Sequence, residues 1–105
     1  MIKVCYLSAV ISIVSILALP AAQAADAAAG EDTYSSMGCM GCHGPGGASA
    51  MPDMFPGLAG LEEAYIVEQL NAFKSGERVN ATMQPMSSAL SDDDIANLAA
   101  YLSAQ

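Results

Sequence analysis

Basic residues are scarce in this chain, and their scarcity limits what it can bind. The 105 residues include three Lys or Arg against eleven Asp or Glu, so the formal net charge is −8 at pH 7. A surface this acidic is repelled by the phosphates of nucleic acids and of anionic membranes. We therefore expect no nucleic-acid partner, and the charge favours protein partners that carry a basic patch.

Histidine and cysteine are also rare, at one and three residues. Cys39 and Cys42 form the only CxxC pair. A zinc site would need a second CxxC pair or a second histidine, and a thioredoxin-like redox pair would need a surrounding βαβ pattern. The sequence has neither, and it shows no strand pattern or internal repeat, so it predicts an all-α domain.

What the sequence does contain is the run Cys39-Met40-Gly41-Cys42-His43, the attachment signature of a covalently bound c-type haem. Positions i and i+3 of a helical turn share a face, so both thiols can reach the two vinyl groups on one edge of a porphyrin. The imidazole that follows is the predicted proximal axial ligand of the iron. The motif thus predicts one haem c, covalently held by both cysteines.

The N-terminal segment has the features of an export signal. Lys3 is followed by an almost wholly apolar stretch over residues 4–19, and then by Pro20 and the small-x-small pattern Ala22-Gln23-Ala24. We predict a cleaved signal peptide at residues 1–24 and a mature domain at 25–105 that lies in the periplasm without stable membrane insertion. The alternative is a retained anchor, although the apolar stretch is short for a membrane span.

Three helices are predicted in the mature domain, at residues 27–37, at 61–75 and from 91 onward. Asp26 and Ser91 are the expected N-caps of the first and last, and Gly76 is expected to end the second. Gly30 is a poor helix former, which suggests a close helix crossing at that position. Residues 44–60 and 76–89 are predicted as loops without regular structure, the first wrapping the haem edge.

Apolar residues recur at helical spacing in the second and third helices. The expected core-facing sets are Tyr65, Ile66, Leu70 and Phe73 in one, and Ile95, Leu98, Ala99 and Leu102 in the other.

The order helix, CxxCH, loop, helix, methionine loop, helix resembles a class I cytochrome c. The segments Phe55–Gly60, Met83–Met86 and Leu90–Tyr101 resemble, more narrowly, the bacterial cytochrome c553 and cytochrome c4 group. The resemblance implies three to four helices wrapped around one haem, a low-spin iron with His and Met ligands, and electron transfer without catalysis. Cytochrome c4 has two such domains and this sequence shows one, which places it with the monohaem relatives.

The resemblance also implies two further site residues. The family's distal methionine stands seven residues before the leucine that matches Leu90, which is Met83; relatives with shorter loops would place it nearer Met86. The backbone carbonyl of Pro56 is the implied acceptor for the second ring nitrogen of His43. Candidates for bonding the haem propionates are Tyr65, Asn71, Arg78 and Asn80, with none preferred.

Two functions remain open from the sequence. The first is a soluble one-electron carrier between redox partners such as an oxidase, a reductase or a flavoprotein. The second is the haem subunit of a flavocytochrome c sulfide dehydrogenase or a similar complex, suggested by the apolar segment at residues 51–55. A gas-binding or peroxidase-like haem needs an open sixth position, and the two methionines before the last helix disfavour it.

Overall fold

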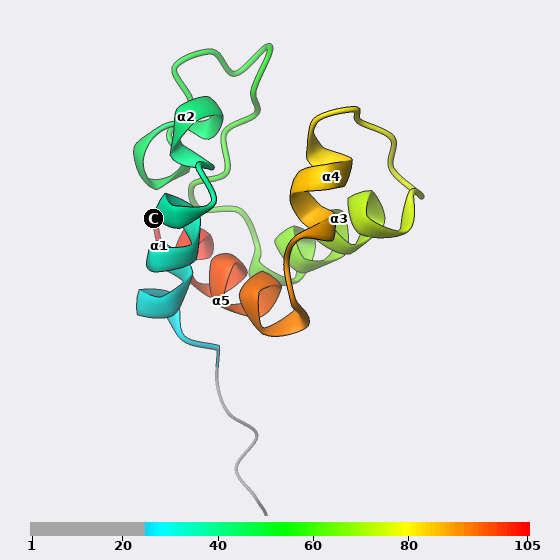
Figure 1. Ribbon diagram of the computed structural model, residues 1–105. Coiled ribbons are helices and arrows are strands. Elements are labelled where there is room, and N and C mark those ends of the chain that lie inside the picture. The colour runs from blue at the N-terminus through cyan, green and yellow to red at the C-terminus, as the bar shows by residue number, and fades with distance from the viewer. Residues whose placement is uncertain (1–24) are drawn as a thin grey trace, which may run out of the picture.

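The computed structural model describes residues 25–105, and the predicted signal peptide lies outside the described residues. The elements are α1 (Ala27–Ser36), α2 (Met40–His43), the 3₁₀ turn η1 (Pro45–Gly47), α3 (Glu63–Ser75), α4 (Met83–Ser88) and α5 (Asp92–Ser103) (Figure 1). No strand occurs within this range, so the all-α prediction is confirmed. Across residues 25–105, no helix has both the length and the apolarity needed to cross a membrane.

The predicted helix caps are present. Asp26 accepts hydrogen bonds from the backbone N–H groups of Ala28 and Ala29 in the first turn of α1, at 2.9 and 3.2 Å. Ser91 forms a capping box with Asp94, in which each side chain accepts a hydrogen bond from the other residue's backbone N–H. Gly76 ends α3 in the left-handed conformation with φ 83°, which a residue with a Cβ adopts only at a cost. These ends follow from local chemistry.

Several boundaries differ from the sequence predictions. The first helix ends at Ser36, one residue early, and α3 begins at Glu63 instead of residue 61 because the backbone of Glu62, at φ −59° and ψ 135°, is not helical. The 44–60 segment contains the short turn η1, although it was expected to hold no regular element.

Residues 76–89 are not wholly a loop, because α4 carries the two methionines expected there. The side chain of Asn80 accepts hydrogen bonds from the backbone N–H groups of Thr82 and Met83, at 3.0 and 2.9 Å. Pro85 stands in the first turn of the helix, where a missing N–H costs little. Both features are helix-start signals that the sequence interpretation passed over.

The core lies where α1 and α3 pack on α5. The predicted face of α5 is confirmed as buried, and it joins residues from α1, from α3 and from the segment before α5. The core cluster consists of Tyr34, Ile66, Leu90, Ile95, Leu98, Ala99 and Leu102. In α3, Tyr65 was expected in the core but is 45% exposed.

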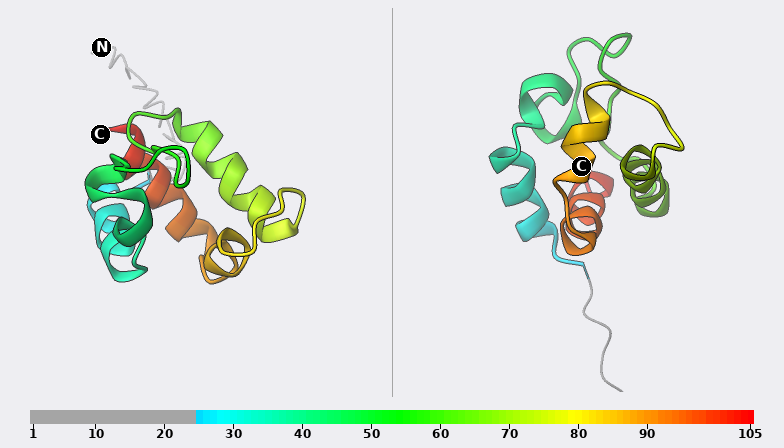
Figure 2. Two further views of the ribbon diagram at one scale, coloured as in Figure 1. Left: turned by 90° about the horizontal axis from the view of Figure 1, so that it is seen from above. Right: turned by 45° about the vertical axis from the view of Figure 1, so that its right-hand side comes forward.

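The helices form two groups that stand on either side of α5. Figure 1 shows α1 and α2 on one side and α3 and α4 on the other, with α5 at the base between them. The view from above in Figure 2 shows the same separation of α2 from α4, with the loop after η1 passing over the top. This arrangement places the CxxCH turn and the methionine helix α4 in different groups (Figure 1).

Candidate functional site

A cavity of about 540 Å³ lies between α2, α3 and α4. Its volume falls within the range of roughly 300–1,000 Å³ that is usual for sites that bury a small organic molecule. Cys39, Cys42 and His43 line it from the CxxCH turn, and Met83 and Met86 line it from α4. The structure therefore brings the predicted attachment and axial residues to one cavity.

The two cysteines lie on one helical turn. His43 and Cys42 both direct their backbone N–H to the carbonyl of Cys39, at 2.9 and 3.3 Å, and neither cysteine is in a disulfide. Cys42 is exposed and Cys39 is half-buried. Burial raises the pKa of the Cys39 thiol, so that thiol is protonated at neutral pH. The spacing of the motif is thus realised as two free thiols on the same turn, beside the cavity.

His43 is held in a fixed orientation. Its side chain is buried, and Nδ1 lies 2.9 Å from the carbonyl oxygen of Pro56. When Nδ1 donates its proton to that carbonyl, Nε2 is left with the free lone pair that a metal ligand needs. The ring of Phe55 stands edge-on to the imidazole, with ring centroids 6.4 Å apart. The loop after η1 thereby restrains the ring that the motif provides.

The two candidate distal ligands share one face of α4. Met83 and Met86 are both half-buried and three residues apart, so their side chains start from the same side of the helix. Met54 also lines the cavity but is 69% exposed, and Met51 lies outside the lining at 54% exposed. Among these methionines, the two on α4 are therefore the better enclosed.

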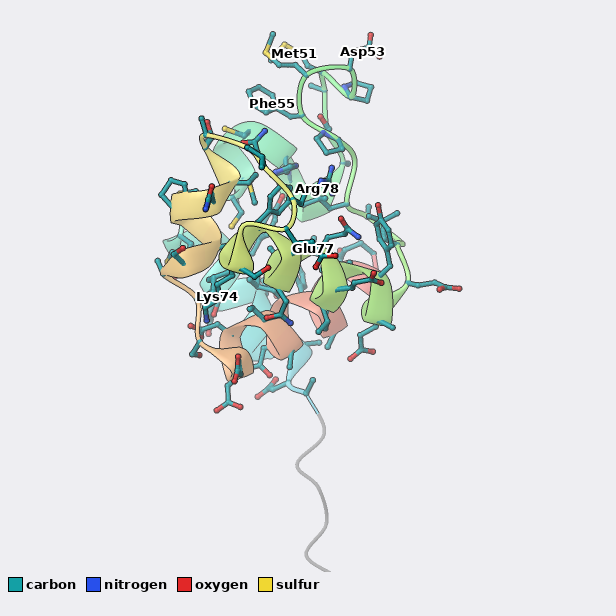
Figure 3. The ribbon with its side chains drawn as sticks, turned by 90° about the vertical axis from the view of Figure 1, so that its right-hand side faces the viewer. Met51, Asp53, Phe55, Lys74, Glu77 and Arg78 are labelled. Atoms are coloured by element: carbon teal, nitrogen blue, oxygen red, sulfur yellow. The ribbon has the colours of Figure 1, made fainter. Side chains whose placement is uncertain are left out.

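Three of the four polar candidates line the cavity, namely Tyr65, Arg78 and Asn80. Asn71 does not line it, and instead borders a separate shallow depression on α3. Arg78 is held in place, because its guanidinium lies 4.6 Å from the centroid of the Phe73 ring and donates a hydrogen bond of 2.7 Å to Gln69. Figure 3 shows Arg78 near the middle of the molecule, well separated from the tip of the loop that carries Met51.

Tyr34 is a functional-site residue that the sequence interpretation missed. It lines the cavity from α1, is 1% exposed, and its hydroxyl donates a 2.6 Å hydrogen bond to the carbonyl of Gly44, directly after His43. Its ring packs against Tyr101 with centroids 5.6 Å apart. Its position in the sequence could have indicated its burial, because Tyr34 stands four residues after Gly30 and therefore lies on the helix face that crosses α5.

The donor set fits a haem better than a bare metal ion. Within residues 25–105, no three His, Cys, Asp or Glu side chains come together as a metal-binding group. The cavity instead offers two thiols for covalent attachment, one imidazole with a free nitrogen, and thioethers on α4, among largely apolar side chains. This combination suits a cofactor that brings its own equatorial ligands.

A family model matches most of the chain. The family model described as "Cytochrome C oxidase, cbb3-type, subunit III" matches residues 25–102. The "Thiosulfate dehydrogenase electron acceptor" of Stutzerimonas stutzeri is 48% identical over 50 residues, which is 48% of this chain and 23% of that protein. Cytochrome c-554(548) of Halomonas halodenitrificans is 42% identical over 55 residues, or 50% of this chain and 66% of that protein.

Solved structures show the same likeness. Cytochrome c4 from Acidithiobacillus ferrooxidans superposes with a TM-score of 0.70 at 33% identity, covering 82% of this chain and 53% of that one. Reduced cytochrome c4 from Pseudomonas stutzeri gives a TM-score of 0.65 at 33% identity, covering 73% and 46%. The chain spans about half the length of these two structures, and less than two thirds of the length of the relatives above.

Proposed function

We propose that this chain carries single electrons in the periplasm through one haem with His and Met ligands. The chain belongs to the cytochrome c family matched over residues 25–102 and is a class I c-type cytochrome of the cytochrome c4-like group. It is an electron-transfer protein and not an enzyme, and its family implies covalently bound haem c. The observation that carries the proposal is that the CxxCH residues and both α4 methionines line one cavity.

Each site residue has a role in this proposal. Cys39 and Cys42 hold the haem covalently, His43 is the proximal iron ligand, and Met83 is the distal ligand, with Met86 as the alternative. When bound, the haem supplies the one-electron couple of its iron. The Pro56 carbonyl fixes the imidazole ring and increases its basicity. A thioether opposite the histidine raises the reduction potential and closes the sixth position to substrates.

The proposed periplasmic location rests on the sequence of residues 1–24, which has the basic start, apolar stretch and small-x-small end of a signal peptide. In the proposed holoprotein both cysteines are bonded to the haem, so the oxidising periplasm does not convert them to a disulfide. N-terminal sequencing of the native protein tests the proposal. A mature N-terminus near residue 25 supports it, and an intact N-terminus at Met1 supports the retained anchor.

The proposed partners are redox proteins that present basic patches, because the chain has few cations of its own. Two relatives, from Stutzerimonas stutzeri and Thiomonas intermedia, are named as electron acceptors of thiosulfate dehydrogenase. We extend to this chain only the role of exchanging electrons with an oxidoreductase.

A second candidate, a permanent haem subunit of a flavocytochrome c sulfide dehydrogenase or a similar complex, is favoured by one observation. Met51 and Met54 are 54% and 69% exposed on a loop whose tip projects from the body (Figure 3). An exposed apolar tip of this kind suits a stable interface. Isolation of the native holoprotein at low salt separates the two: a stoichiometric flavoprotein supports the subunit, and a monomer supports the carrier.

The distal ligand is tested by replacing each methionine of α4. Met83→Ala should make the ferric haem high-spin or open to added ligands, because the sixth position then has no protein ligand. Met86→Ala is the matched control on the same helix face and should stay low-spin. The assignment is wrong if Met86→Ala opens the haem and Met83→Ala does not.

A further inference from the structure

The hydroxyl of Ser87 is buried without a hydrogen-bond partner. The side chain is fully buried, and within residues 25–105 its oxygen is the one buried side-chain polar atom left unpaired. The next residue shows the ordinary solution for a helical serine, since Ser88 donates a 2.8 Å hydrogen bond to the carbonyl of Gln84. An unpaired buried hydroxyl costs free energy, so it calls for a hydrogen bond beyond those made in this structure.

Ser87 lies on the face of α4 that borders the cavity, together with Met83 and Met86. Side chains in a helix lean toward its N-terminus, so residues four apart meet on one face. Ser87 is four residues after Met83 and directly after Met86, and adjacent residues do not face each other. Its hydroxyl is therefore aimed at the turn that carries Met83.

We propose that Ser87 is a positioning residue that donates a hydrogen bond to the thioether sulfur of Met83 and holds it as the distal ligand. This inference rests on the proposed function, and it also explains why Met83 and not Met86 would occupy that role. A thioether sulfur is a weak acceptor, and it keeps a lone pair after using one for a metal. The hydrogen bond withdraws electron density from the sulfur, which favours the reduced state of the site.

The experiment measures imidazole binding to ferric holoprotein, because imidazole competes with the distal methionine. Ser87→Ala removes one oxygen and adds no clash. We expect it to tighten imidazole binding roughly 2- to 10-fold, the range of one neutral hydrogen bond, and to lower the reduction potential. Ser88→Ala is the control, since that exposed serine bonds only to the Gln84 carbonyl and should change neither quantity.

A purely structural role for Ser87 gives different results. If Ser87→Ala changes thermal stability while imidazole binding and potential match the wild type, the hydroxyl is satisfied elsewhere and the inference is overturned. Equal shifts in Ser88→Ala would overturn it as well. Failure of the proposed function is recognised separately, because the wild-type protein would then carry no covalent low-spin haem, whatever Ser87 does.

Discussion

Replacing Gly30 by alanine should force α1 away from α5. A Cβ at this position would lie 2.0 Å from the carbonyl oxygen of Asn97, 2.5 Å from its carbonyl carbon and 2.9 Å from the Cβ of Tyr101. The distance from this Cβ to the carbonyl oxygen of Asn97 must increase to 3.4 Å, at which ordinary van der Waals contact begins. Two of the three atoms are backbone, so no side-chain rotation relieves the clash, and the helices themselves have to move.

The change in the free energy of unfolding caused by Gly30→Ala is the balance of two opposing effects. Overpacking a tight interface costs about 1–3 kcal/mol, and contact with backbone points to the upper end. Alanine regains about 1 kcal/mol over glycine in helix propensity. The net loss is about 2 kcal/mol, out of a total stability on the order of 5–15 kcal/mol. For a domain of this size, that corresponds to a fall in Tm of roughly 8–16 °C.

Thermal and denaturant unfolding of the holoprotein measure this loss. The matched control is Gly41→Ala, a glycine in α2 whose added Cβ would have nothing within 4 Å. It should unfold at or slightly above the wild-type temperature. A Gly30→Ala protein as stable as wild type would refute the close crossing, since the propensity gain alone cannot offset a forced separation of the helices.

Three further outcomes are expected. Cys39→Ala, Cys42→Ala or His43→Ala should each abolish stable holoprotein, measured as covalent haem retained after denaturation; normal low-spin spectra from both cysteine variants would contradict the attachment. Burial raises the pKa of Tyr34, so its contribution to stability is full below the unfolded value of about 10 and is lost as pH rises through the folded value. Denaturant unfolding from about pH 8 to 11 should show this loss of stability. In the Tyr34→Phe variant, the part of the loss that is due to the Tyr34 hydroxyl should be absent. Apoprotein should lack a cooperative thermal transition, because a cavity of about 540 Å³ then replaces part of a small core.

Features that depend on neighbouring residues could be predicted from the sequence. The CxxCH turn, the caps at Asp26 and Ser91 and the end of α3 at Gly76 each use chemistry within a few positions along the chain. The buried face of α5 follows equally from spacing, because a helix with one apolar stripe has one way to bury it. The helix α4 could also have been found, since Asn80 and Pro85 are local signals.

Other features exist only once distant segments meet. The approach of Gly30 to Asn97, the burial of Tyr34 and the unpaired hydroxyl of Ser87 depend on how α1 and α3 pack on α5 and how α4 packs on α3. The family resemblance indicated Pro56 as a partner of His43, but the 2.9 Å contact depends on the path of the whole loop.

The sequence by itself thus determined the attachment turn, the helix ends and the fold class, because these follow from contacts within a turn or two of helix. Tertiary structure decided which methionines and polar groups share the cavity with that turn. The physical reason is that the distances between residues on different helices depend on the packing of several helices at once, which no short stretch of sequence encodes.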